Sequence, residues 1–331
     1  MSQPKTYVAI DGGNSKTHLV LGDANGRVLA FVAGPGSSPH MLGVPGCIAL
    51  LGSLIARALA DAGLPPGTVL DRAEVYIAGA DLPVEVDVLT KAIGEAGWAR
   101  EHRVDNDLFA LLRAGTSVPD AVAVVCGAGI NCVGRSTDGR TARFPSLGQI
   151  SGDWGGGHHL AALALWHAAR GEDGRGPATA LVAAVAAHFG RSTVEEVSAG
   201  LHLGELDKER VNDLSPVLFA VAAAGDPVAR SVVIEQATEV VALATVAARR
   251  LSLLDKAYSV VLGGGVLTAR HPLLHENVVS GILASAPQAT IGIVADPPAA
   301  GAALFALDSF GTTPAEVESM VRAAVRAAAK G

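Results

Sequence analysis

Two charged residues suited to phosphate chemistry, Asp11 and Lys16, lie in a short glycine-rich segment near the start of the chain. Residues 7–10 form an apolar run that predicts a β-strand leading into this segment. Glycines let backbone N–H groups approach a ligand closely, and successive N–H groups form an anion-binding nest. A carboxylate at the strand end suits a water-mediated contact to Mg²⁺, and an ammonium group suits a phosphate. The alternative interpretation is an ordinary glycine-rich hairpin turn.

The same strand-and-glycine pattern recurs at residues 121–139. A second apolar run there leads into Gly127 and Gly129, and then into another β-prone run. Each copy ends in a short turn, Asn25-Gly26 in the first and Asp138-Gly139 in the second, and such dipeptides are typical of type I′ hairpin turns. A repeat of this size predicts two similar sheets that face each other across a cleft.

Asp107 lies where a short predicted strand, residues 101–107, gives way to a predicted helix that starts at Leu108. One interpretation is a helix N-cap, because Asp is favoured there and a cap contributes about 0.5–2 kcal/mol. A carboxylate at the end of a strand beside a cleft also suits a general base that takes a proton from a hydroxyl group. Asp105 is the local competitor for that role, and the residues alone leave cap and base open.

Five glycines occur within residues 148–157, and the last three, Gly155 to Gly157, precede a predicted helix. A helix N-terminus is a natural site for anions and ligand oxygens. Asp153, in the same segment, could accept hydrogen bonds from ligand hydroxyl groups. The alternative is a flexible joint in front of a helix.

Apolar periodicity, together with the signals for helix starts and ends, predicts the strands and helices that carry these segments. The loop at residues 34–40 has polar groups that could line a cleft. Strands are expected at residues 7–10, 18–21, 27–31, 73–78, 101–107, 121–125, 257–262 and 290–294. Helices are expected at residues 45–62, 84–96, 108–114, 158–170, 177–189, 207–224, 227–254, 272–284, 301–310 and 314–330.

The bulk composition is that of a soluble globular protein long enough for two domains. The chain has 331 residues, of which 50% are hydrophobic and 4% aromatic. The net charge of −7 argues against a basic surface for nucleic acid. No signal peptide and no uninterrupted apolar run of membrane-spanning length is apparent. Three cysteines without paired spacing indicate reduced thiols, so we expect a cytoplasmic protein.

Three other chemistries have little support in the sequence. The pair His158-His159 lacks the spacing of a zinc site on a helix. Neither a GxxxxGK[ST] phosphate loop nor a GxSxG nucleophile motif is present. Residues 263–265 are three glycines after a predicted strand, which falls short of the dinucleotide-binding fingerprint.

Taken together, the chain resembles the sugar kinase/Hsp70/actin superfamily, and within it the BadF/BadG/BcrA/BcrD-type ATPase group that includes N-acetylglucosamine kinases. DGGNSKT at residues 11–17 resembles the first phosphate loop, and GAGIN at 127–131 resembles the second. SLGQISGDWGGG at 146–157 resembles a sugar-contacting segment, and VVLGGGV at 260–266 resembles the adenosine loop. The resemblance implies an α/β protein with the actin-like ATPase (ribonuclease H-like) fold, in which two similar domains surround a central cleft. It also implies an ATP-dependent carbohydrate kinase that uses Mg²⁺.

The resemblance assigns a role to individual residues of this chain. Asp107 would be the catalytic base, and Asp11 would organise Mg²⁺ through water. ATP phosphates would be bound by Gly12, Gly13, Asn14, Ser15, Lys16, Thr17, Gly127, Ala128 and Gly129. Adenosine would lie against Gly264 and Gly265. The sugar would be bound by Ser38, His40, Asp107, Asn131, Gly148 and Asp153.

Departures from the family pattern fall mainly on the sugar side. Trp154 stands where the kinases usually carry Glu, and Ser38 stands where they tend to carry a sugar-contacting Asn. Ala128 and Ile130 replace Thr and Ser in the second loop. Phosphoryl transfer from ATP is therefore better supported than the identity of the acceptor. The resemblance makes N-acetylglucosamine the first choice of acceptor, with glucosamine or another amino sugar as the alternative.

The resemblance also predicts the domain organisation and a competing function. We expect an N-terminal domain at residues 1–116 and a C-terminal domain at 117–299, with the terminal helix at about 300–331 packing back on the first. A homodimer is possible, and neither a nucleic-acid nor a membrane partner is expected. The competing function of another class is an ATPase activator of a dehydratase or reductase, which would need cluster-binding cysteines.

Overall fold

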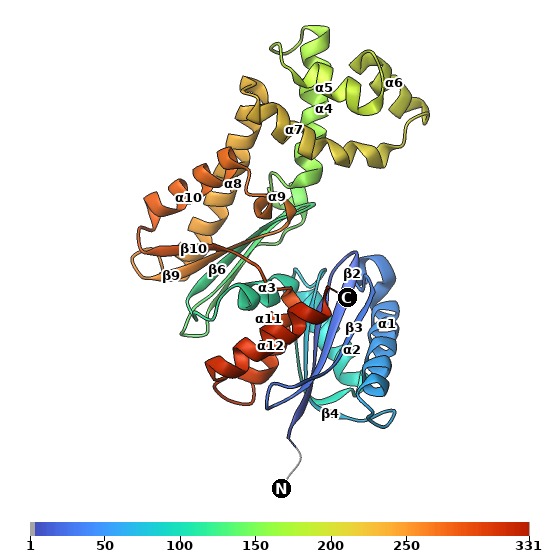
Figure 1. Ribbon diagram of the computed structural model, residues 1–331, viewed down its shortest axis with the longest axis vertical. Helices are drawn as coiled ribbons and strands as arrows, with labels where there is room; N and C mark the ends of the chain where they lie inside the picture. The colour runs from blue at the N-terminus through green and yellow to red at the C-terminus, as the bar shows by residue number, and fades with distance from the viewer. Residues whose placement is uncertain (1–3, 331) are drawn as a thin grey trace. The chain divides into compact units, whose positions relative to one another are not determined.

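The computed structural model describes residues 4–330, and the chain divides into two compact units (Figure 1). Unit 1 contains residues 4–123, Val133–Pro145 and residues 294–330, and unit 2 contains Val124–Cys132 and Ser146–Ile293. The division into domains at residues 1–116 and 117–299 stays a prediction.

Unit 1 is built on a five-stranded mixed sheet with the order β3-β2-β1-β4-β5. β1 pairs antiparallel with β2 and parallel with β4, and β4 pairs parallel with β5. Gly12 is in register with Ile77, and Ile77 with Asn106, so the carboxyl ends of three strands meet at one edge. The strands are β1 (Thr6–Gly12), β2 (Lys16–Asp23), β3 (Val28–Pro35), β4 (Leu70–Ile77) and β5 (Ala99–Asn106).

One face of this sheet packs against α1 (Pro39–Asp61) and α2 (Pro83–Ala96). The alternating residues Val8 and Ile10 of β1 join a buried cluster that includes Leu51 of α1. The helix predicted from residue 45 begins earlier, at Pro39, and is broken at Gly43, where φ is 66°. Two helices therefore join at a kink just before a proline.

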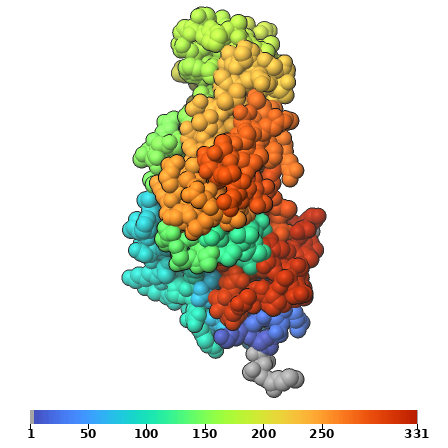
Figure 2. Space-filling view, turned by 90° about the vertical axis from the view of Figure 1, so that its left-hand side faces the viewer, coloured from blue at the N-terminus to red at the C-terminus, as the bar shows by residue number. Residues whose placement is uncertain are grey.

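The other face of the sheet is covered by α11, which packs on β1, β4 and α3. The ring of Tyr76 stacks on Phe305 with centroids 5.2 Å apart. Gly301 lets α11 approach α3, because a β-carbon there would lie 1.9 Å from the carbonyl oxygen of Ala110. Figure 2 shows the C-terminal residues of unit 1, in red, on its surface beside the blue N-terminal strands. The helices are α3 (Asp107–Gly115), α11 (Pro298–Asp308) and α12 (Ala315–Ala328).

The second sheet has the strand order β10-β9-β6-β7-β8, and the boundary between the two units crosses β6 and β7. β10 pairs parallel with β9, and β7 pairs antiparallel with β8. The strands are β6 (Ala121–Cys126), β7 (Ile130–Arg135), β8 (Thr141–Arg143), β9 (Tyr258–Gly263) and β10 (Ala289–Ile293).

The two hairpin turns have the same construction, although the predicted type I′ geometry is wrong. Gly26 and Gly139 have φ values of 81° and 86°, whereas the preceding Asn25 and Asp138 do not have a positive φ. Asp23 N donates to Arg27 O, and Ser136 N donates to Arg140 O in the same way. Each connection therefore has three residues and ends in a left-handed glycine.

Helices make up most of unit 2, and α4, α5, α6 and α7 pack together as a helical cluster (Figure 1). The sequence analysis missed α6, although its N-cap Thr193 accepts a hydrogen bond from Glu196 N. α5 starts at Leu181 and not at residue 177. The helices are α4 (Gly157–Asp173), α5 (Leu181–Phe189), α6 (Val194–Leu203), α7 (Leu214–Ala223), α8 (Pro227–Arg250), α9 (Gly265–Thr268) and α10 (Pro272–Ser285), with 3₁₀ turns η1 (Gly148–Ser151) and η2 (Lys208–Asp213).

Two helices, α1 and α8, are long and apolar enough to cross a membrane by length and composition alone. Each helix buries one face inside its own unit, through residues such as Leu54 of α1 and Val240 of α8. Core packing accounts equally well for their apolar composition.

Candidate active site

Three carboxylates lie near the carboxyl ends of neighbouring parallel strands of unit 1. Asp11 lies near the end of β1, Asp81 follows β4, and Asp107 follows β5. In open sheets, ligands bind beyond the carboxyl ends of parallel strands. This edge is therefore the place in unit 1 to expect polar chemistry.

Asp107 is the first residue of α3, and it is not the N-cap. The N-cap is Asn106, whose side-chain oxygen accepts a hydrogen bond from Leu108 N at 3.0 Å. Burial and the nearby carboxylate of Asp81 raise the pKa of Asp107 to about 7. A half-buried carboxyl group with such a pKa can accept a proton near neutral pH, as a general base must.

Asp105, the competing carboxylate, is occupied by two arginines. Its Oδ2 accepts a hydrogen bond from Arg103 at 3.0 Å, and its Oδ1 accepts one from Arg143 of β8. The side chain is buried, at 4% exposure, and both of its oxygens face arginines and not solvent. The structure therefore favours Asp107 over Asp105 as the base.

The predicted first phosphate loop connects β1 and β2 in a tight turn. Gly13 N donates to Lys16 O at 2.9 Å, while Asn14 and Ser15 are exposed at the tip. Within residues 4–330, no group accepts a hydrogen bond from the N–H of Asn14 or Ser15. Two successive free N–H groups make this turn suitable for an anion.

Thr17 supports this loop from inside. Its hydroxyl group donates to the carbonyl oxygen of Pro35 at 2.8 Å and lies 2.8 Å from the hydroxyl oxygen of Ser37. Gly36 lies directly beneath the turn, because a β-carbon there would be 1.9 Å from Asn14 O. Thr17 is fully buried, so the structure does not place its side chain among the exposed groups of the loop.

Asp11 is the candidate for organising a metal ion. Burial raises its pKa to about 7, the carboxylate of Asp107 adds to this rise, and Lys16 opposes it. In the described part of the chain, no cluster of three or more metal-ligating side chains is present. Magnesium in kinases is held by one or two carboxylates together with substrate phosphates and water. A single carboxylate beside a phosphate loop fits such a site.

Besides Asp107, unit 1 contains two sugar-binding candidates, which differ in exposure. Ser38 is fully buried, and its hydroxyl oxygen has no hydrogen-bond partner among the described residues. His40 is exposed and forms a 2.8 Å contact with Glu85. His40 lines a small groove of about 200 Å³ between α1 and α2, whose walls also include Val44 and Val88.

In unit 2, backbone segments from three elements meet at the predicted second phosphate loop. A β-carbon on Gly156 would lie 2.6 Å from the α-carbon of Gly129, and Gly157 N donates to Gly127 O at 2.7 Å. Gly264, with a φ of 81°, packs so closely that a β-carbon would lie 2.4 Å from Cys126 O. The glycine-rich segments at residues 127–129, 155–157 and 264–265 therefore form one cradle, with Ala128 and Gly129 exposed.

Gln236 of α8 holds this cradle, and the sequence analysis did not identify it. Its Oε1 accepts a hydrogen bond from Gly156 N at 2.9 Å, and the side chain is fully buried. His159 Nδ1 accepts a second hydrogen bond from Gly155 N, at 2.9 Å. Gln236 interrupts the apolar face of α8 formed by residues such as Val232 and Val240, and this polar position on an apolar face is the sequence signal that could have identified it.

The remaining sugar-binding candidates of unit 2 lie before α4. Asp153 Oδ2 accepts hydrogen bonds from Gly148 N at 2.9 Å and from Ser151 Oγ at 2.8 Å. Asn131 is half-buried, and its side-chain oxygen accepts from Cys132 N at 2.6 Å. Trp154 packs edge-on against His159 with ring centroids 4.8 Å apart. The structure thus assembles the predicted residues in two groups, one within each unit.

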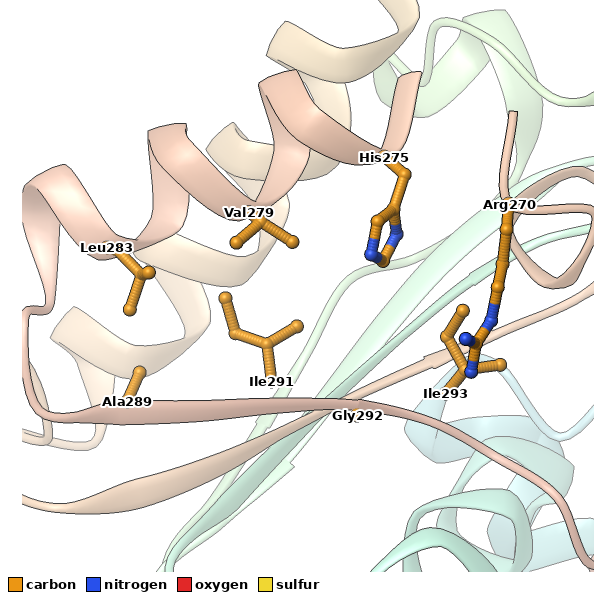
Figure 3. A pocket seen from close by; sticks show the side chains of 8 residues that line it. All are labelled: Arg270, His275, Val279, Leu283, Ala289, Ile291, Gly292 and Ile293. Carbon is orange, nitrogen blue, oxygen red and sulfur yellow. The ribbon is translucent and has the colours of Figure 1, made fainter. Parts of the chain in front are cut away.

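A separate groove of unit 2, about 370 Å³, lies between α10 and the edge strand β10 (Figure 3). Val279, Leu283 and Ile291 form its apolar wall, with Arg270 and His275 at the other end. None of the predicted site residues lines it.

Known proteins resemble this chain in sequence over most of its length. A family model described as the BadF/BadG/BcrA/BcrD ATPase family matches residues 8–306. The chain is 25% identical to an N-acetyl-D-glucosamine kinase of Dictyostelium discoideum, over 92% of this chain and 98% of that one. It is 26% identical to an N-acetylmuramic acid/N-acetylglucosamine kinase of Clostridium acetobutylicum, over 80% and 86% of the two chains.

The fold is also that of solved structures. A protein of Chromobacterium violaceum, provisionally described as an N-acetylglucosamine kinase, superposes with a TM-score of 0.67 at 20% identity. The match covers 91% of this chain and 98% of that one. The predicted α/β, actin-like ATPase fold is confirmed.

Proposed function

Because this chain belongs to the BadF/BadG/BcrA/BcrD ATPase family, we propose that it is an ATP-dependent amino-sugar kinase whose acceptor is N-acetylglucosamine. The names of the two curated relatives support a kinase acting on an amino sugar. The observation that carries the catalytic part of the proposal is Asp107, which lies at the same strand-end edge as Asp11 and the first phosphate loop.

Asp107 takes the proton from the acceptor hydroxyl. The hydroxyl oxygen then bonds to the γ-phosphorus of ATP as the bond to the β-phosphate oxygen breaks, which leaves ADP. A pKa of about 7 lets the carboxylate accept that proton at neutral pH. The loop at Asn14 and Ser15 and the ammonium group of Lys16 offset phosphate charge, since phosphoryl transfer depends on positioning and electrostatic stabilisation.

Mg²⁺, when bound with ATP, neutralises charge on the β- and γ-phosphates. Asp11 would hold it through water. In unit 2, the exposed backbone of Ala128 and Gly129 would bind phosphate, and Gly264 and Gly265 would lie against adenosine.

The acceptor is the finer part of the proposal. Asp153 has one carboxylate oxygen held by Gly148 and Ser151, and its other oxygen suits a sugar hydroxyl group. Ser38 has a hydroxyl group without a partner, but its side chain is fully buried, so it would reach a sugar only after a movement of the residues that cover it. Glucosamine or another amino sugar is the alternative acceptor, because Trp154 replaces the family Glu next to Asp153.

An ATPase activator of a dehydratase or reductase is not favoured. Such a protein needs accessible cysteines to hold an iron–sulfur cluster. Here Cys47, Cys126 and Cys132 are all fully buried, and burial raises the pKa of Cys47 to about 11. We also propose that the protein is cytoplasmic. A homodimer is a separate proposal, which light scattering of the purified protein would test.

The deciding experiment measures ADP release from Mg·ATP with N-acetylglucosamine, glucosamine, glucose, N-acetylmannosamine and N-acetylmuramic acid. We expect N-acetylglucosamine to give the highest kcat/KM, and Asp107→Asn to lower kcat by ~10²-fold or more. Asp87→Asn is the matched control, because Asp87 is an exposed residue on α2. Acceleration by no sugar, with slow ATP hydrolysis unchanged in Asp107→Asn, would overturn the proposal.

A further inference from the structure

Asp81, in the loop between β4 and α2, bonds directly to the residue that precedes the proposed base. Its Oδ1 accepts a hydrogen bond from Asn106 Nδ2 at 2.8 Å. Neither the sequence motifs nor the family resemblance assigns this residue a role. The contact joins the ends of two adjacent parallel strands, β4 and β5.

The Asn106 side chain uses both ends of its amide group. The nitrogen donates to Asp81, and the oxygen accepts from Leu108 N at 3.0 Å in the first turn of α3. Because an amide nitrogen cannot accept a hydrogen bond, the bond to Asp81 selects the orientation that caps the helix. Asp107 lies in the chain between Asn106 and Leu108, which this hydrogen bond joins. The direction of the Asp107 side chain therefore depends on how Asn106 is held.

Asp81 is itself held in place by Glu85. Glu85 Oε2 accepts hydrogen bonds from the N–H groups of Asp81, at 3.0 Å, and Leu82, at 2.8 Å. Its other oxygen contacts His40 Nε2 at 2.8 Å. The loop that presents Asp81 is therefore fixed from the first turn of α2.

We propose that Asp81 is a positioning residue for Asp107: it orients the Asn106 cap of α3 and places a second carboxylate beside the base. The proposal rests on the proposed role of Asp107 as the base. Asp81 acts through Asn106 and through its charge, without contact to the reacting atoms.

The charge of Asp81 has a consequence for proton transfer. Two neighbouring carboxylates resist ionising together, so each raises the proton affinity of the other. The carboxylate of Asp11 is also coupled to Asp107, and Lys16 acts on Asp11 in the opposite direction. Asp105, two residues before Asp107, is paired with Arg103 of β5 and Arg143 of β8. The pKa of Asp81 is itself raised to about 6. Burial makes the largest contribution and the carboxylate of Glu85 adds to it, whereas His40, Asn106 and Arg143 act in the opposite direction.

Two substitutions at Asp81 separate its charge from its hydrogen bond. Asp81→Asn removes the charge and keeps a side-chain oxygen that accepts from Asn106, whereas Asp81→Ala removes both. We expect Asp81→Asn to move the acid limb of kcat/KM down by ~0.5–1 pH unit, with kcat on the plateau within ~3-fold of wild type. We expect Asp81→Ala to lower kcat by ~10-fold or more, with little change in KM for ATP, because the base is misplaced.

Asn106→Ser tests the hydrogen bond between Asp81 and Asn106 by changing the donor residue. Serine still caps a helix but is too short to bond to Asp81 in place of the amide, so we expect the kcat loss of Asp81→Ala. Circular dichroism would check that each variant is folded, and Asp87→Asn on α2 is the control. Wild-type kcat in both Asp81→Ala and Asn106→Ser, with an unshifted acid limb in Asp81→Asn, would overturn the proposal.

Asp107→Asn, measured in parallel, distinguishes the two proposals. If Asp107→Asn is inactive while the Asp81 and Asn106 variants behave as wild type, only the positioning role of Asp81 fails. If Asp107→Asn keeps full activity, the base assignment fails, and the role of Asp81 fails with it.

Discussion

A β-carbon added to Gly156 would lie 2.6 Å from the α-carbon of Gly129. Only glycine fits at position 156, the N-cap of α4, if the start of this helix is to pack against the second phosphate loop. We expect Gly156→Ala to displace the loop and raise KM for ATP by about tenfold, equivalent to ~1.4 kcal/mol. Steady-state kinetics with varied Mg·ATP would measure this.

The control for Gly156→Ala is Gly292→Ala. Gly292 lies in β10 with open space where a β-carbon would be, and it is outside the proposed site. A KM for ATP equal to that of wild type in Gly156→Ala would show that the loop does not bind phosphate.

The pKa of Asp107 predicts how activity depends on pH. Because its pKa is raised to about 7, the carboxyl group is protonated below that pH and cannot act as a base. We expect kcat/KM for the sugar to fall about tenfold per pH unit below the pKa. A profile that stays flat from about pH 5.5 to 8 would contradict the assignment.

The Glu318 carboxylate predicts a loss of stability in acid. Its hydrogen bonds to Arg113, Ser117 and Arg322 lower its pKa to about 2 despite partial burial, which acts in the opposite direction. Ionised Glu318 therefore stabilises the folded state above its ordinary pKa, and this stabilisation is lost as pH falls towards 2.

The variant Glu318→Gln tests this directly. At about pH 6, we expect its free energy of unfolding to be lower by roughly 2–3 kcal/mol, and the difference should shrink as pH falls from about 5 to 2. Urea titrations at several pH values would measure it. Glu316→Gln on the same helix is the control, since Glu316 is exposed. Equal stabilities at about pH 6 would refute the prediction.

Thr17 and Lys16 are adjacent, yet we expect their substitutions to act differently. Thr17→Val removes buried hydrogen bonds at Pro35 and Ser37, so it should lower the free energy of unfolding by about 1–3 kcal/mol. Lys16→Met should leave stability unchanged and weaken Mg·ATP binding by about tenfold. Calorimetry would measure both quantities, and an unchanged affinity in Lys16→Met would exclude its contact with phosphate.

Much of the local structure could be predicted from residue patterns. Continuous apolar runs predicted the strands, and glycine and proline signals predicted most helix ends within a few residues. The errors arose where local signals are degenerate. Asn25-Gly26 is typical of a type I′ turn, yet the Asp23 carboxylate accepts a hydrogen bond from Asn25 N and stabilises a three-residue connection. Asp107 and Asn106 are both good caps, and only the observed hydrogen bond identifies Asn106.

The sequence by itself determined which residues could do the chemistry: Asp107 after a strand, Asp11 and Lys16 around a glycine turn, and three further glycine-rich segments. It determined this because glycine spacing and strand-end carboxylates are local properties of the chain. Only the tertiary structure decided that Thr17 faces inward, that Gln236 holds Gly156 across 80 positions, and that Asp81 bonds to Asn106. Those contacts depend on the antiparallel pairing of β2 with β3, on the packing of α8 beside Gly156, and on the parallel pairing of β4 with β5. Each brings together residues that are distant in the chain, and no periodicity in the sequence encodes them.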